Sequence, residues 1–130
     1  MRIDLQDGLL FVSLTLVYQG RTYTIDRVVL DTGAAQSLLD RDAVEPLHIK
    51  PEQSDEIVTM MGIGGPEIAL RKQIDQLQFG SYKQDNPWLD FGLLDAHPGI
   101  NGLLGADILV NGRFIIDLEN MEVYQHSEMK

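Results

Sequence analysis

Hydrophobic and polar residues alternate over many short stretches of this chain, and turn-forming residues separate the stretches. Residues 9–17 and 22–30 are rich in aliphatic and β-branched side chains, and Gln19-Gly20-Arg21 forms a turn between them. This pattern predicts a hairpin whose second strand leads into Asp31. Further extended segments are predicted later in the chain, at 37–39, 57–61, 68–79, 87–94, 113–118 and 121–124. Many short strands joined by glycine-rich turns indicate a mainly β fold.

Short helices are predicted at two points, and one segment fits either a helix or a strand. Asp40 is a suitable N-cap for a helical turn over 41–44, and Pro46 disfavours a longer helix there. The apolar segment 103–109 predicts the end of a strand followed by a helical turn. Helix and strand patterns overlap in short runs, so residues 70–77 fit both, and we favour a strand there.

The size and composition of the chain indicate one domain. Its 130 residues are 44% hydrophobic and 23% charged, which are ordinary values for a soluble globular protein. The absence of cysteine excludes disulfides and thiolate metal sites, and it suits a reducing cytoplasm. The first residues lack the apolar core of a signal peptide, and no apolar run approaches the roughly 20 residues of a membrane span. We therefore expect a cytoplasmic protein.

The charge of the chain bears on its partners. The net charge is −10, so the surface would repel nucleic acid and anionic membranes at long range. His48, His97 and His126 are scattered in or near predicted loops, with no acid at a matching spacing, so we expect no metal site. Trp88 and Phe91 are expected in the core or in a pocket wall, not stacked on nucleic-acid bases.

One short motif stands out at the end of the second predicted strand. Residues 28–37 read Val-Val-Leu-Asp-Thr-Gly-Ala-Ala-Gln-Ser, and the triplet Asp31-Thr32-Gly33 occurs once in the chain. An apolar strand that ends in an acid, a hydroxyl residue and a glycine can hold a carboxyl group at the floor of a cleft. Two features follow in order: a glycine-rich hairpin at 61–65, and an apolar segment at 100–109 that contains Gly105.

These three features, in this order and spacing, resemble the retropepsins, the single-lobe aspartic proteases of retroviruses and of their cellular and bacterial relatives. The resemblance extends over about 9–118. It implies a single domain over 1–130, with a core at about 9–118 and a C-terminal extension at 121–130. It also implies a mainly β, single-lobe, closed β-barrel-like acid protease fold with one or two short helices, active as a two-fold dimer.

The resemblance assigns a role to each residue of the Asp-Thr-Gly loop. Asp31 matches the catalytic acid, which activates water. Thr32 matches the threonine whose hydroxyl bonds across the dimer axis. Gly33 matches the glycine that lets the substrate backbone approach, and Ala34 completes the supporting loop.

Two further segments are assigned in the same way. The glycine-rich hairpin matches the flap, a lid over the substrate, and its candidate substrate-binding residues are Met61, Gly62, Ile63 and Gly64. The late apolar segment packs beside the active-site loop in the family, and its matching residues are Leu103, Leu104 and Gly105.

The single triplet implies that the second catalytic carboxyl comes from another chain. Two carboxyls a few ångströms apart share one proton. The ionised carboxyl takes a proton from water as the water attacks a peptide carbonyl, and the protonated one supports the developing tetrahedral oxygen. This chemistry requires no metal and no organic cofactor. The resemblance therefore implies a homodimeric aspartic endopeptidase that cleaves extended peptide or protein segments.

Two other functions stay open. One is a non-proteolytic dimerisation or binding module on the same fold, because one fold hosts many functions. The other is an enzyme whose second aspartate comes from a different protein chain. The intact Asp31-Thr32-Gly33 triplet and the intact glycine-rich hairpin favour the homodimeric enzyme over the binding module.

Two positions depart from the viral pattern. Viral retropepsins usually carry an aspartate two residues after the triplet glycine and an arginine directly after the late glycine, and these form a buried ion pair near the dimer interface. Here the positions are Ala35 and Ala106, so both partners are absent together and no buried charge is left unpaired. Asp107 lacks the Thr-Gly that follows Asp31. It is therefore expected to cap a helical turn or support the fold, and not to act as a second catalytic acid.

Overall fold

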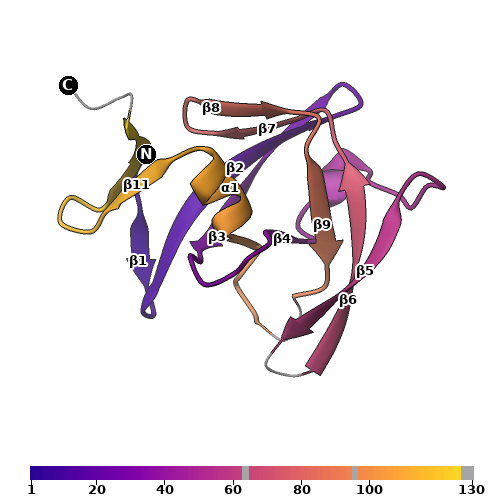
Figure 1. Ribbon diagram of the computed structural model, residues 1–130, viewed down its shortest axis with the longest axis horizontal. Helices are drawn as coiled ribbons and strands as arrows, with labels where there is room; N and C mark the ends of the chain where they lie inside the picture. Colours follow the sequence, from indigo (N-terminus) through magenta and orange to yellow (C-terminus); the bar gives the residue numbers. More distant parts are fainter. Residues whose placement is uncertain (63–64, 95–96, 127–130) are drawn as a thin grey trace.

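A computed structural model of the chain describes residues 1–62, 65–94 and 97–126, and its regular structure is almost entirely β (Figure 1). The strands are β1 (Asp4–Gln6), β2 (Leu9–Tyr18), β3 (Arg21–Leu30), β4 (Leu38–Asp40), β5 (Glu56–Gly62), β6 (Gly65–Gln73), β7 (Gln76–Phe79), β8 (Tyr82–Asp85), β9 (Trp88–Gly92), β10 (Gly102–Leu104), β11 (Phe114–Asp117) and β12 (Glu122–Gln125). The helices are the 3-10 helix η1 (Glu45–Leu47) and the α-helix α1 (Ala106–Asn111). The expected mainly β fold with short helices is confirmed.

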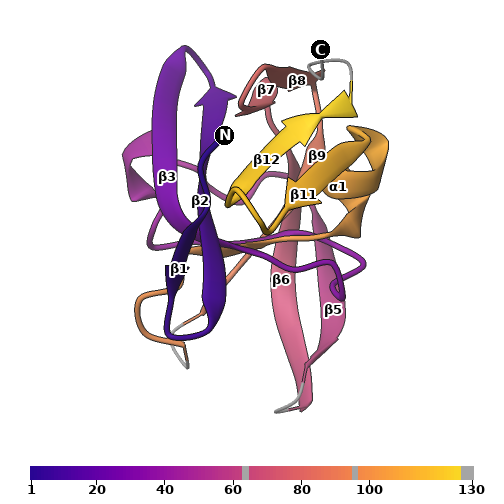
Figure 2. The ribbon, with the colours of Figure 1, turned by 90° about the vertical axis from the view of Figure 1, so that its left-hand side faces the viewer.

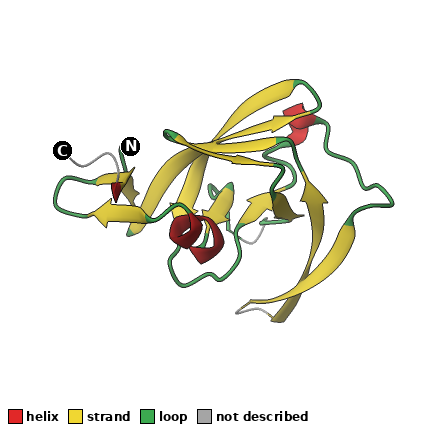
Figure 3. Ribbon diagram, turned by 45° about the horizontal axis from the view of Figure 1, so that its top comes forward, coloured by secondary structure: helices red, strands yellow, loops and turns green. Residues whose placement is uncertain are grey.

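Ten of the strands form one sheet that curls into a half-barrel (Figure 3). Along the described part of this sheet the order is β5-β6-β9-β4-β10-β3-β2-β7-β8, and β1 pairs with β2. Most neighbours are antiparallel, but β10 runs parallel to β3 and β4 runs parallel to β9. These parallel pairs bring segments 28–40 and 88–104 side by side at the centre of the sheet.

The two longest strands, β2 and β3, form the predicted hairpin and supply much of the core. Four alternate residues of β2 are buried: Val12, Leu14, Leu16 and Tyr18. The last three residues of β3, at 28–30, are buried consecutively, which means that both faces of the strand are covered there. The register shifts between Val12 and Leu14, so β3 has an extra residue shortly before Asp31.

The segment at 70–77, which fitted both a helix and a strand, is β-structure, and the helix alternative is wrong. β6 ends at Gln73, β7 begins at Gln76, and buried Ile74 lies between them. β6 pairs with β5 on one edge and β9 on the other, and β7 pairs with β2 and β8. Partners on both edges decide the conformation, because the local pattern is common to both structures.

The helical turn expected from Asp40 over 41–44 is also wrong. Asp40 is the last residue of β4, and its carboxylate accepts a hydrogen bond from the Leu94 backbone N–H at 3.3 Å. Residues 41–44 form turns, and the 3-10 helix begins at Glu45 without a side-chain cap. β4 continues through Asp40 because it pairs there with Gly92 of β9. Tertiary pairing thus overrides the capping preference of the aspartate.

The N-terminal residues lie against the C-terminal hairpin (Figure 2). β11 and β12 form the hairpin predicted from the alternation at 113–124. Met1 and Val123 exchange two hydrogen bonds of 2.7 Å, and Ile3 N–H donates to Met121 O at 2.8 Å. Residues 121–126 of the expected C-terminal extension are therefore part of the fold, and 127–130 lie outside the described residues.

Two apolar clusters position the segments that bear on function. The larger fills the half-barrel and contains Phe79, Phe91 and Leu104, each at most 1% exposed. The smaller joins Leu38 of β4 to Ala69 of β6 and to Leu94, with Val58 and Ile100 packed at its margin. It attaches the β5–β6 hairpin to the strand that directly follows the Asp31 loop.

Candidate active site

Asp31 directly follows β3 and begins a tight turn. Its backbone N–H donates to Leu104 O at 2.9 Å, which continues the β3–β10 pairing by one residue. Its carboxylate Oδ1 accepts the Gly33 N–H at 3.0 Å, and its carbonyl accepts the Ala34 N–H at 3.1 Å. Asp31 is partly exposed, whereas Thr32 and Gly33 are exposed. The turn therefore presents a carboxylate and two accessible neighbours at the surface of one chain.

Gly105 allows the late segment to pack directly on the Asp31 loop. A Cβ at this position would lie 2.6 Å from Ala34 O and 3.0 Å from Gln36 C, and backbone atoms cannot move aside as a flexible side chain can. The adjacent Ala106 N–H donates to Ala34 O at 2.7 Å. Leu103 and Leu104 pair with Val29 and Leu30 of β3. The structure thus brings together the loop and the late segment that the sequence singled out.

Asp107 is bonded to the Asp31 loop by its side chain. It is in the first turn of α1, whose N-cap is Gly105, so it is not the cap itself. Its carboxylate accepts hydrogen bonds from the Ser37 hydroxyl at 2.7 Å and the Ser37 N–H at 3.0 Å. Sequence reasoning missed Ser37, although its position six residues after Asp31 and the unassigned acid at Asp107 were both visible.

The glycine-rich hairpin is formed by β5 and β6. Its register runs from Glu56 opposite Arg71 to Gly62 opposite Gly65. Met61 and Gly62 of the candidate flap therefore lie at the closed end of this hairpin, whereas Ile63 and Gly64 lie outside the described residues.

Two neighbouring cations on β6, Arg71 and Lys72, hold the base of this hairpin through ion pairs. Arg71 forms a bidentate ion pair with Asp90 of β9, in which Nε donates to Oδ1 at 2.8 Å and Nη2 donates to Oδ2 at 3.1 Å. Asp90 is 3% exposed, and its hydrogen bond raises the pKa of Arg71. Lys72, the next residue, is directed to the opposite face of the strand. The two neighbouring cations thus bind the hairpin to two different parts of the molecule.

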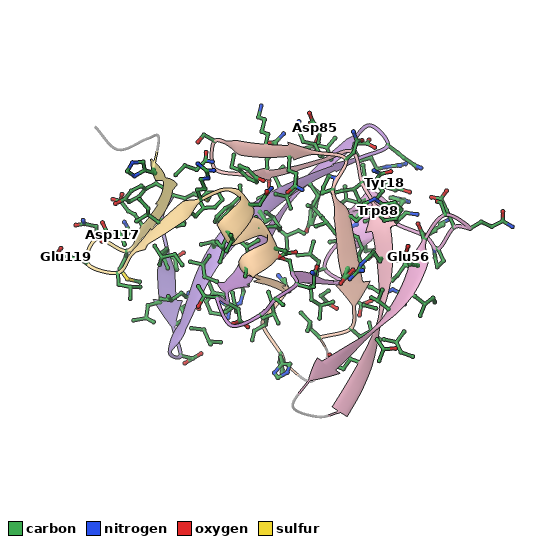
Figure 4. All side chains as sticks on the ribbon, in the orientation of Figure 1. Tyr18, Glu56, Asp85, Trp88, Asp117 and Glu119 are labelled. Atoms are coloured by element: carbon green, nitrogen blue, oxygen red, sulfur yellow. The ribbon has the colours of Figure 1, made fainter. Side chains whose placement is uncertain are left out.

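Lys72 lies in a cluster with buried Tyr18, the buried carboxylate of Asp55 and the exposed Glu52. Its Nζ is 2.8 Å from Glu52 Oε1 and 2.9 Å from Asp55 Oδ2, and the Tyr18 hydroxyl donates to Glu52 at 2.9 Å. Burial disfavours the charged amine, but the hydrogen bonds outweigh burial and raise the pKa of Lys72. Figure 4 shows Tyr18 near the base of the β5–β6 hairpin. Sequence reasoning missed this cluster, because it joins three segments, at 18, 52–55 and 72, that are 17 to 54 residues apart.

Arg27 forms hydrogen bonds with the loop that precedes β10. It has a left-handed backbone with φ 55°, at the bulge in β3. Its guanidinium stacks 4.3 Å above the Phe11 ring, and its Nε donates to Gly99 O. Its own carbonyl accepts the Asn101 N–H at 2.9 Å. A bulky residue with positive φ has no sequence pattern that would reveal it.

A hollow of about 490 Å³ is lined by segment 41–50 together with residues of β6 and β9, and Asp31 does not line it. Its lining includes Val44, Ile49, Leu70, Phe91 and Leu93, together with charged residues of segment 41–50. The charges there are of both signs, so the hollow has no evident ligand preference.

Within the described residues, no group of three or more His, Asp or Glu side chains is placed to hold a metal ion. None of the helices in this part of the chain has the length and apolar character that a membrane span requires.

Comparisons with known proteins agree with this geometry. A family model described as aspartyl protease matches residues 14–108, more than half of the chain, so the chain belongs to the aspartyl protease family. Among solved structures it is similar to a retropepsin-like aspartic protease from Rickettsia conorii, with a TM-score of 0.66 and 18% identity. The match covers 94% of this chain and 86% of that chain, and it shows a retropepsin-like fold. Comparison with curated proteins gives no match.

Proposed function

We propose that this protein is a homodimeric aspartic endopeptidase in which Asp31 is the catalytic residue. The observation that supports this most is the Asp31 turn itself. A carboxylate stands at the end of a buried strand, oriented by the Gly33 N–H, and is flanked by exposed Thr32 and Gly33. One chain offers a single such triplet, so a two-fold dimer would supply the second carboxyl.

The proposed mechanism uses the two Asp31 carboxyls as a pair. One carboxylate takes a proton from a water molecule while the water attacks the scissile carbonyl carbon, and the protonated carboxyl donates to the developing oxyanion. The proton taken from the water then passes to the leaving amine nitrogen as the C–N bond breaks, and a hydroxyl of the collapsing tetrahedral intermediate returns its proton to the other carboxyl. Thr32 would bond across the axis, and the exposed Gly33 would let the substrate backbone approach.

The substrate in this proposal is an extended peptide or protein segment. The β5–β6 hairpin would close over it as the flap, with Met61, Gly62, Ile63 and Gly64 at the contact, and exclude bulk water from the carboxyl pair. We propose that residues 1–130 act as one domain, and that the cysteine-free chain works in the cytoplasm.

The test is peptide cleavage by the purified protein and its Asp31→Asn variant across a pH range. Asparagine keeps the shape of the side chain but removes the ionisable group, so kcat/KM should fall by about 10²–10⁴-fold. Asp85→Asn is a matched control, because Asp85 is an exposed aspartate on β8 (Figure 4). Undiminished cleavage by cleanly purified Asp31→Asn would rule out the mechanism.

Sedimentation of the same samples separates the alternatives. The proposal expects dimers under the conditions in which cleavage is measured. A monomer with full activity would contradict the dimeric mechanism. A stable dimer that cleaves no peptide at any pH would instead favour a non-proteolytic binding module on the retropepsin-like fold.

A further inference from the structure

Ser37 and Asp107 join the Asp31 loop to α1 through a hydrogen-bonded pair. Ser37 is 3% exposed, and its hydroxyl donates to Asp107 Oδ1 at 2.7 Å. The Ser37 backbone N–H donates to Asp107 Oδ2 at 3.0 Å. Both oxygens of one carboxylate are thus directed at a single residue near the end of the loop that begins with Asp31.

The Ser37–Asp107 pair lies beside backbone hydrogen bonds that join the Asp31 loop to segment 104–107. Ser37 Oγ accepts the Gly105 N–H at 2.9 Å, in a buried position. Next to it, Ala106 N–H donates to Ala34 O, and further along Asp31 N–H donates to Leu104 O. Segment 104–107 therefore contacts the loop at its start, its middle and its end, and only the Ser37 contacts depend on side chains.

We propose that Ser37 and Asp107 are positioning residues that fix the direction of the Asp31 carboxyl. Ala35 and Ala106 lie in the same two segments and offer no polar side chain to join them. The inference rests on the proposed catalytic role of Asp31. Two carboxyls must be aimed at one water molecule, and a displacement of about 1 Å can lower a rate about 100-fold.

The chemistry of the pair requires a carboxylate at 107 and a hydroxyl at 37. Asp107 also accepts the Ile108 N–H at 2.9 Å, so it serves donors from two residues. Asparagine has one acceptor oxygen, and its amide would face a donor, so Asp107→Asn leaves a donor of Ser37 without a partner. Ser37→Ala removes the acceptor for Gly105 N–H, whereas Ser37→Thr keeps the hydroxyl.

Steady-state kinetics on purified variants test the proposal, at a temperature well below each unfolding midpoint. Ser37→Ala and Asp107→Asn should lower kcat about 100-fold and change KM less than about twofold, because substrate contacts are intact. Ser37→Thr should restore kcat to within about threefold of the parent. Equal losses of kcat in Ser37→Thr and Ser37→Ala, or an unchanged kcat in Ser37→Ala, would overturn the proposal.

Asp117→Asn is the matched control. The Asp117 carboxylate also accepts from a backbone N–H and a side chain, both of Asn120, at 3.0 and 2.9 Å. It lies at the bend between β11 and β12, at the far end of the molecule from Tyr18 (Figure 4). The kcat of the Asp117→Asn variant should match that of the parent protein. A loss equal to that of Asp107→Asn would show a general effect of removing such a carboxylate and would overturn the proposal.

Amide hydrogen exchange gives a readout that does not depend on cleavage. In Ser37→Ala, the amides of Asp31, Gly105 and Ala106 should exchange at least about tenfold faster, while the Ile74 amide keeps its rate. Unchanged exchange at the three amides, or equal acceleration at Ile74, would overturn the proposal. Absence of cleavage by the parent protein would contradict the proposed function instead, and the exchange result would still decide whether Ser37 holds the loop.

Discussion

Lys72 Nζ lies 2.9 Å from Asp55 Oδ2, and both side chains are 3% exposed. Lys72 is on β6, and Asp55 directly precedes β5, so this ion pair joins the two strands at the base of the candidate flap. Lys72 Nζ also donates to Glu52, which accepts a second hydrogen bond from the Tyr18 hydroxyl. The base of the hairpin is thus attached to β2 and to the loop before β5.

The first prediction concerns the stability of this base. Lys72→Met removes the cation and leaves Asp55 as a buried charge without its partner, so the free energy of unfolding should fall by about 3–5 kcal/mol in urea denaturation. Lys83→Met, at an exposed lysine on β8, should change it by less than about 0.5 kcal/mol. The double variant Lys72→Met/Asp55→Leu should regain most of the loss. A double variant no more stable than Lys72→Met would show that the charge of Asp55 is not the cause.

The second prediction is a pH dependence that follows from Glu52. Hydrogen bonds, first from Lys72 and then from Tyr18, lower the pKa of Glu52 from its ordinary value of about 4.5. A carboxyl with a lowered pKa in the folded state stabilises the protein above the unfolded value. That stability is lost as pH falls through the folded value. Unfolding should therefore become easier below about pH 4.5, and Glu52→Gln should reduce this dependence.

The control for this pH dependence is Glu119→Gln, at an exposed glutamate beside the β11–β12 bend (Figure 4). Urea unfolding at neutral and acidic pH measures both variants and the parent. The Glu119 variant should keep the acid dependence of the parent. If Glu52→Gln kept it in full as well, Glu52 would not contribute to acid unfolding.

The third prediction concerns Gly105. Gly105→Ala would place a methyl group 2.6 Å from Ala34 O, so the Asp31 loop must move. We expect about 1–3 kcal/mol of destabilisation and loss of most peptide cleavage. Gly8→Ala, at a turn with φ 78° and open space around the new methyl, should cost about 1–2 kcal/mol and leave cleavage intact. Equal activities of the two variants would contradict the close contact.

The fourth prediction concerns Arg27. Arg27→Ala removes the stacking on Phe11 and the hydrogen bond to Gly99 O, so the Asn101 amide should exchange faster with solvent. Arg27→Lys should not restore slow exchange, because an ammonium lacks the planar fork that stacks and donates together. Arg21→Ala, at an exposed position of β3, is the control. Rescue by lysine would show that positive charge alone is sufficient.

The fifth prediction concerns Thr32, which is exposed in the single chain. If its hydroxyl bonds across the dimer axis, Thr32→Val should raise the dimer dissociation constant at least about tenfold and leave the unfolding of the monomer nearly unchanged. Sedimentation over a range of concentrations measures this constant. Thr22→Val, at an exposed threonine on β3, is the comparison. The same dissociation constant in both variants and the parent would remove Thr32 from the interface.

Most of the fold and the position of the candidate site could be predicted from the sequence. Alternation at 9–17 and 22–30 predicted the hairpin that ends at Asp31, and the structure confirms it. The terminal hairpin at 113–124 was predicted in the same way. These predictions succeed because a strand that is buried on one face has hydrophobic residues at every second position, and because turns require particular residues. The aspartyl protease family followed from three local motifs in order.

Tertiary structure alone decided the contacts that hold these motifs. Whether 70–77 forms a helix or strands depended on the pairing of β6 with β9, and Asp40 became a strand end because β9 lies beside it. The bonds between Ser37 and Asp107, and between Lys72 and Asp55, join residues 70 and 17 positions apart. A single sequence contains each of these side chains but not their partners, because a hydrogen bond between distant residues leaves no periodic pattern and forms only once the sheet has curled.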